Sequence, residues 1–188
     1  LRTDFNIFGL KTEDMPQIKR KSRMKQVYIK AGIPVARGGV VHTLAQAKKL
    51  VEETGYPLVA KPDSDVGAAA AYKIPNPQEL ENFFEVKPPV EYIMEEFIQG
   101  QICTFDGLTD REGNLVFMNS LVYNMGIMET VNEDALVYYY SLRDIPTDLE
   151  EAGRKLVKAF DVRERFFHFE FFRTLDEGTL VGLEVTMR

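Results

Sequence analysis

Two alternating segments near the C-terminal end of the chain constrain its fold more than any other feature. Residues 166–172 read Phe-Phe-His-Phe-Glu-Phe-Phe, and residues 180–188 alternate with the same period of two. One face of the second segment carries Val181, Leu183, Val185 and Met187, and the other carries Gly182, Glu184, Thr186 and Arg188. This period is typical of β-strands, and Asp176-Glu177-Gly178 between the segments favours a turn. The sequence therefore predicts an antiparallel hairpin.

The hairpin predicts that two carboxylates face one another. A turn centred at Glu177 places Glu170 opposite Glu184, at a Cβ separation of about 4.5–5.5 Å, where like charges repel. A cation between them would remove this repulsion, and carboxylate oxygens suit Mg²⁺, which also takes phosphate ligands. Two alternatives stay open: a solvated strand face with incidental glutamates, or one carboxylate protonated or paired with Arg188.

His168 shares the predicted strand face of Glu170. Two roles stay open for it: a satisfied, partly buried histidine, or a residue that supports the metal ligands from behind.

Helix and strand signals alternate along the rest of the chain. Helices are expected over 19–31, from the capping box at Thr43-Leu44-Ala45-Gln46 to about Gly55, and after the N-cap Asn76 with Pro77. A further capping box at Thr147-Asp148-Leu149-Glu150 opens a helix whose core-facing stripe is Leu149, Ala152, Leu156, Val157 and Phe160. Strands other than the hairpin are expected at 40–41, 58–61, 69–74, 92–94, 104–108, 115–122 and 136–140.

This order of elements predicts an α+β fold with two lobes, since the first half mixes helices with strands and the second half is mostly hairpins. We assign residues 1–18 to the end of a preceding domain or a linker. Residues 19–95 form the expected N-terminal lobe, and 96–188 form a C-terminal lobe that is truncated at its C-terminal end.

Composition excludes several classes of function. The chain has 188 residues with 23 Lys and Arg against 29 Asp and Glu, a net charge of −6. This charge argues against a general nucleic-acid or anionic-membrane surface, and no apolar run is long enough to span a bilayer. A single cysteine excludes an intramolecular disulfide and favours a reducing compartment, so we expect a cytoplasmic location.

Two further segments carry weaker signals. Leu58–Pro62 leads into residues 63–71, a small-residue loop whose backbone N–H groups can approach an anion while Lys61 supplies a charge. Residues 92–100 can present backbone groups to an adenine edge, with Val59, Met94 and Phe172 as apolar neighbours. The alternative for residues 63–71 is an ordinary hairpin turn. The alternative for residues 92–100 is an edge strand that links the lobes.

Taken together, these segments resemble the ATP-grasp superfamily, which includes D-alanine–D-alanine ligase, biotin carboxylase and the carbamoyl phosphate synthetase large subunit. The segments that carry the resemblance, in order, are 21–25 with 31–35, 55–62, the small-residue loop, 94–100, 168–172 and 183–188. The resemblance covers nearly all of residues 19–188 and implies the ATP-grasp fold, with ATP held between the two lobes.

The resemblance also implies site residues. For ATP they are Lys21, Lys61, Asp65, Val66, Gly67, Ala68, Glu95, Glu96, Phe97, Ile98 and Phe172, of which the two lysines contact phosphates and Phe172 lies beneath the adenine. The implied Mg²⁺ ligands are Glu170, Glu184 and Thr186, and Arg188 is implied as the catalytic residue near the γ-phosphate.

The activity implied is an ATP- and Mg²⁺-dependent ligase that activates a small-molecule carboxylate as an acyl phosphate for attack by an amine. A bicarbonate-activating enzyme of the carbamoyl-phosphate-synthase or biotin-carboxylase kind is one alternative. A non-catalytic ATP-binding module is the other, favoured by Ile102, Asp65 and Thr186, which depart from the family pattern. A homodimer is compatible with each.

Overall fold

Two antiparallel sheets build the protein in the computed structural model, which describes residues 4–5, 9–64, 71–124, 136 and 138–187. The smaller sheet has four strands in the order β1 (Gly38–Val41), β4 (Tyr92–Glu96), β2 (Leu58–Pro62) and β3 (Tyr72–Ile74). The larger has six: β10 (Leu180–Met187), β9 (Arg165–Thr174), β5 (Gly100–Thr109), β7 (Leu121–Tyr123), β8 (Tyr139–Ser141), and β6 (Leu115–Asn119) paired with β5. The predicted α+β class is confirmed.

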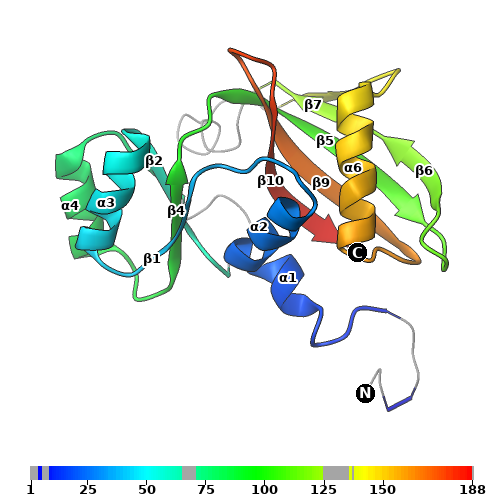
Figure 1. Ribbon diagram of the computed structural model, residues 1–188, viewed down its shortest axis with the longest axis horizontal. Helices are drawn as coiled ribbons and strands as arrows, with labels where there is room; N and C mark the ends of the chain where they lie inside the picture. The colour runs from blue at the N-terminus through cyan, green and yellow to red at the C-terminus, as the bar shows by residue number, and fades with distance from the viewer. Residues whose placement is uncertain (1–3, 6–8, 65–70, 125–135, 137, 188) are drawn as a thin grey trace.

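The smaller sheet is covered on its outer face by α3 (Leu44–Thr54) and α4 (Pro77–Val86) (Figure 1). Both helices begin as the sequence predicts. The Thr43 hydroxyl accepts a hydrogen bond from the Gln46 amide in a complete capping box, and Asn76 caps α4 through the Glu79 amide. These caps satisfy amides that the first helical turn leaves without partners.

The larger sheet is covered on one face by α6 (Thr147–Ala159), whose buried side chains lie against the phenylalanines of β5 and β9. The predicted stripe is confirmed, but the predicted capping box is wrong. Thr147 is already helical and Pro146 holds the cap position without a side-chain bond. Asp148 instead binds Arg173 through both oxygens, at 2.8 and 3.0 Å, which ties α6 to β9.

Two helices precede the smaller sheet, namely α1 (Met15–Lys19) and α2 (Lys21–Lys30) (Figure 1). Met24 and Tyr28 of α2 are buried in the core of the larger sheet, together with Ile33. Part of the expected N-terminal lobe therefore packs against C-terminal strands. The lobe boundaries themselves stay a prediction.

Several predicted strands differ in extent from those observed. Residues 115–122 form two strands instead of one, because β6 and β7 both pair with β5, at Asp106↔Asn119 and Cys103↔Val122. Within the residues that the structure describes, no helix is both long enough and apolar enough to cross a membrane.

Candidate active site

The C-terminal hairpin brings its two glutamates together as predicted, but by a different route. Near the turn the register is Leu180↔Arg173 and Gly182↔Phe171, which corresponds to a turn centred half a residue before Glu177. An irregularity between Gly182 and Glu184 then shifts the register, so that Glu184 lies opposite Glu170. Leu183 is the extra residue, and such β-bulges commonly re-aim a side chain near a functional site.

This bulge corrects the predicted alternation of β10. Gly182 does not share the face of Glu184, because it pairs with Phe171 on the core side and lies against the ring of Tyr28. The Tyr28 hydroxyl donates to the Glu184 carbonyl over 2.7 Å. Helix α2 is thereby fixed to the strand that carries the carboxylate.

The surroundings of Glu184 fit a divalent cation. Burial raises the pKa of its carboxyl group, Lys21 opposes this effect, and the neighbouring charge of Glu170 raises the pKa further. The Lys21 ammonium lies 4.0 Å from the Glu184 carboxylate, beyond hydrogen-bonding distance. A cation between the two carboxylates would stabilise both charged forms.

The protein supplies only part of a metal coordination shell. Thr186 is exposed and lies opposite His168, one pair further along the hairpin than the two glutamates. Across the described residues, no group of three or more His, Cys, Asp or Glu side chains is arranged to hold a metal. Two carboxylates and a hydroxyl therefore fit Mg²⁺ only when phosphates or waters complete its six ligands.

Lys61 lies at the end of β2 and forms a buried ion pair with Glu95 of β4, at 2.8 Å. Burial lowers the pKa of Lys61, but Glu95, Glu184 and Glu170 outweigh it, so the pKa lies above its ordinary value. Because Lys61 interacts with charges on both sheets, the predicted lysine and the predicted metal ligands belong to one electrostatic cluster.

Lys25 also belongs to this cluster, although no sequence motif predicts a role for it. Its ammonium lies 2.7 Å from Glu95 and donates to the carbonyls of Ala36 and Gly38 as well. Glu95 is thus held between two lysines that come from different elements. Lys25 lies four residues after Lys21 in α2, and residues at this spacing share one helix face. This spacing is the sequence signal that indicates a place for Lys25 near the site.

Asp63 fixes Lys21 relative to Lys61. Its buried carboxylate accepts hydrogen bonds from the amide and the hydroxyl of Ser22, and its carbonyl accepts from the Lys21 amide at 2.8 Å. The end of β2 therefore caps the start of α2, although the two segments are about forty positions apart. No local sequence pattern predicts this cap, because its two partners are distant in the sequence.

The predicted adenine-binding segment is only partly assembled. The Glu96 carboxylate turns away to Arg37, with bonds of 2.7 and 2.8 Å, and the Phe97 amide donates to the Pro57 carbonyl. Among the hydrogen bonds between described residues, none uses the amide of Ile98 or of Gln99 as a donor. Phe172 of β9 is half-buried and pairs with Ile102, near the beginning of β5.

Met94 was wrongly expected beside the adenine. Its side chain is buried in the core of the smaller sheet, below α3 and α4. Neighbouring residues of a strand point to opposite faces, so Met94 cannot share the face of Glu95. Val59 pairs directly with Glu95 and does lie on that face.

His168 is held between two carboxylates. Its Nδ1 lies 2.5 Å from Asp106 and its Nε2 lies 3.1 Å from Glu170. Burial alone would lower the pKa of His168, but these two bonds raise it from 6.5 to about 10. The histidine is thus satisfied and partly buried, and its contact with Glu170 leaves the role behind the metal ligands open as well.

Some predicted residues lie outside the described part of the chain. They are Asp65, Val66, Gly67 and Ala68 of the small-residue loop, and Arg188.

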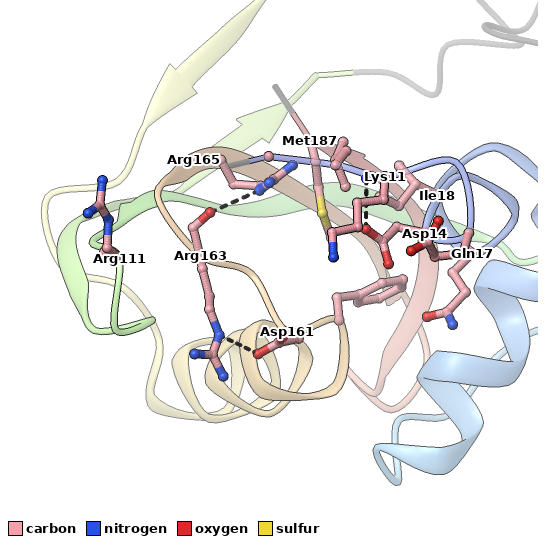
Figure 2. A pocket seen from close by; sticks show the side chains of 13 residues that line it. Lys11, Asp14, Gln17, Ile18, Arg111, Asp161, Arg163, Arg165 and Met187 are labelled. Carbon is pink, nitrogen blue, oxygen red and sulfur yellow. Dashed lines mark hydrogen bonds and ion pairs between the residues drawn. The ribbon is translucent and has the colours of Figure 1, made fainter. Parts of the chain in front are cut away.

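A separate hollow of about 710 Å³ lies between residues 9–18, the segment that follows α6, and Met187 (Figure 2). Met187 points to the opposite face of β10 from Thr186, and none of the predicted site residues lines this hollow. Its charges largely compensate one another, as in the pair between Arg163 and Asp161 at 2.7 Å. The hollow is therefore distinct from the site described above.

Comparisons with known proteins show what this chain resembles in sequence and in fold. No protein-family model matches the chain. It is 26% identical over 132 residues to the C-terminal section of the carbamoyl phosphate synthase large chain of Methanopyrus kandleri, covering 68% of this chain and 23% of that protein. It is also 26% identical over 164 residues to the carbamoyl phosphate synthase large chain of Agathobacter rectalis, covering 84% and 15%. The chain spans less than a quarter of either relative.

Solved structures share the fold. An L-amino acid ligase from Bacillus licheniformis superposes with a TM-score of 0.76 at 21% identity, covering 100% of this chain and 44% of that one. The biotin carboxylase–β,γ-ATP complex from Campylobacter jejuni gives 0.74 at 24% identity, with the same coverage. The biotin carboxylase domain of a Hydrogenobacter thermophilus 2-oxoglutarate carboxylase, in complex with MgADP and bicarbonate, gives 0.70 at 20% identity, covering 94% and 41%. With the ordered site segments, these similarities show that the chain has the ATP-grasp fold and resembles ATP-grasp enzymes in sequence.

Proposed function

We propose that the protein is an ATP- and Mg²⁺-dependent ligase that activates a small-molecule carboxylate as an acyl phosphate for attack by an amine. The observation that carries this proposal is the pairing of Glu170 with Glu184 beside two lysines. Such a set of charges suits a nucleotide whose phosphates arrive with a divalent cation.

The proposed reaction needs no nucleophile from the protein. The substrate carboxylate attacks the γ-phosphorus, the bond to the β,γ-bridging oxygen breaks, and ADP leaves. An amine then attacks the acyl carbon, and inorganic phosphate leaves. The contribution of the protein is to position the reactants and to stabilise charge on the transferring phosphoryl group.

The roles of the described residues follow from their charge and place. Lys21 and Lys61 neutralise phosphate oxygens, and Glu95 orients Lys61 through their 2.8 Å ion pair. Glu170, Glu184 and the Thr186 hydroxyl would hold Mg²⁺, which supplies Lewis-acid polarisation of the phosphate oxygens when bound. The Ile98 amide donates to the adenine edge, and Phe172 with Val59 supplies apolar contacts to the ring.

Five predicted residues enter the proposal from the resemblance alone. By the resemblance, Asp65, Val66, Gly67 and Ala68 would serve the phosphates of ATP, and Arg188 would serve the γ-phosphate and the acceptor.

A hydroxylamine trap tests the proposal. The intact protein is incubated with ATP, Mg²⁺ and single carboxylic acids, including amino acids, and hydroxylamine converts any acyl phosphate into a stable hydroxamate. We expect ADP and hydroxamate in equal amounts with one class of acid, and neither product from Glu184→Gln. The matched control is Glu177→Gln, which changes an exposed glutamate in the turn of the same hairpin.

Binding of ADP without ADP formation from ATP, over the whole range of acceptors, would contradict the ligase and favour the non-catalytic module.

A second candidate is activation of bicarbonate. It is favoured because both sequence relatives are named carbamoyl phosphate synthase large chain, and one structural neighbour was solved with bicarbonate. ADP formation that requires bicarbonate and no organic acid would select this candidate.

A further inference from the structure

We propose that His168 is a positioning residue that orients the metal ligand Glu170, and that Asp106 and Thr104 hold His168 for this purpose. The inference rests on the proposed function, because it takes Glu170 as a metal ligand. It concerns three residues to which the resemblance assigns no role.

The first observation is the geometry of the imidazole. Its Nε2 lies 3.1 Å from Oε1 of Glu170 and its Nδ1 lies 2.5 Å from Oδ1 of Asp106. With both nitrogens engaged by carboxylates, the ring cannot rotate without losing a charge-assisted bond. One Glu170 oxygen is therefore fixed by His168, which directs the other carboxylate oxygen.

The second observation is that Asp106 is itself held. The Thr104 hydroxyl donates to Oδ2 of Asp106 over 2.5 Å, and the Leu121 amide donates to the Thr104 oxygen over 3.0 Å. Thr104 is buried, and its hydroxyl group acts both as the donor to Asp106 and as the acceptor from Leu121. The result is a continuous chain of hydrogen bonds from β7 through β5 to β9, and it ends on Glu170.

The third observation is the place of this chain in the sheet. Asp106 pairs with His168 and Thr104 pairs with Glu170, so the four side chains share one face. Thr186 lies opposite His168 on the other side of β9. The chain therefore supports the metal face from β5, while β10 supplies Glu184 and Thr186. Removing a residue that hydrogen-bonds to a metal ligand commonly weakens metal affinity by about 10–100-fold.

The test measures how strongly a metal strengthens nucleotide binding, with Mn²⁺ and ADP as the probes and calorimetry as the method. The dissociation constant of ADP is determined in EDTA and in saturating Mn²⁺, and the ratio of the two is the metal enhancement. We expect His168→Leu to lower this enhancement about tenfold or more while the affinity for ADP in EDTA stays unchanged. Asp106→Asn should lower the metal enhancement as well. Because this substitution keeps the size of the side chain, it tests the inference even if His168→Leu fails to fold.

Two further variants separate positioning from general damage. His42→Leu removes the other histidine, which is exposed, and should leave the enhancement unchanged. In a Glu170→Gln background, His168→Leu should cause no further loss, because a residue that acts through Glu170 has nothing left to orient.

Equal losses of ADP affinity with and without Mn²⁺ would overturn the inference, as would an undiminished enhancement in both His168→Leu and Asp106→Asn. If the wild-type protein itself shows no metal enhancement, the proposed metal site fails instead. The two failures are thus distinguishable.

Discussion

Glu184 lies directly opposite Glu170 because Leu183 is an extra residue in β10. The register set by the turn would otherwise bring Leu183 to that place and turn Glu184 toward the core face, since a shift of one residue exchanges the two faces of a strand. The pair of carboxylates is therefore a product of the bulge.

Glu184→Gln should stabilise the metal-free protein while it removes metal binding. The pKa of Glu184 is raised by burial and by Glu170, so its ionised form at neutral pH opposes folding. We expect a gain of up to about 1 kcal/mol in the free energy of unfolding, measured by urea denaturation in EDTA. The exposed turn variant Glu177→Gln should show no comparable gain, and a clear loss of stability in Glu184→Gln would contradict the prediction.

Lys25→Met should destabilise the protein by about 1–3 kcal/mol, because the Ala36 and Gly38 carbonyls and the Glu95 carboxylate all lose a donor. Nucleotide affinity should fall as well, since Glu95 is then free to shift relative to Lys61. Chemical denaturation and calorimetry with ADP measure the two effects.

The matched control is Lys48→Met, which breaks the exposed pair between Lys48 and Glu81 at 2.8 Å, compared with 2.7 Å for Lys25 and Glu95. Such surface pairs contribute about 0–1 kcal/mol. Equal losses in the two variants would show that burial does not distinguish Lys25.

The buried pair of Glu95 should make stability depend on acid pH. Burial raises the pKa of Glu95, but Lys61 and Lys25 outweigh it, and the pKa lies below the ordinary 4.5. A lowered carboxyl pKa contributes stability that is complete above the unfolded value and is lost as the pH falls through the folded one. The difference in free energy of unfolding between wild type and Glu95→Gln should be constant above pH 4.5 and shrink below it. A difference that stays constant down to acid unfolding would contradict this.

Gly182→Ala should cost about 1–3 kcal/mol through overpacking. A Cβ at this position would meet Cδ1 of Tyr28 at 2.1 Å, so α2 would have to move away from β10. Thermal unfolding measures the loss. Gly39→Ala is the control, with no neighbouring atom within 4 Å of its Cβ and an expected change within about 0.5 kcal/mol.

Much of the fold was predictable because its signals are local. Capping boxes depend on side chains three residues apart, as for Thr43 and Gln46, and the amphipathic stripe of α6 depends on helical spacing alone. The local signal failed at Thr147, where the ion pair of Asp148 with Arg173, twenty-five positions away, engages the side chain next to the expected cap.

Local patterns in the amino-acid sequence predict the two strands of the C-terminal hairpin, the starts of α3 and α4, and an order of segments that indicates the ATP-grasp superfamily. Four features are visible only in the folded protein: Leu183 is an extra residue in β10, Asp63 caps α2, Lys25 shares Glu95 with Lys61, and His168 bridges Asp106 and Glu170. The physical reason is the range of the interactions. Periodicity and capping act over a few residues, whereas the site is built from hydrogen bonds and ion pairs between strands and helices that are distant in sequence.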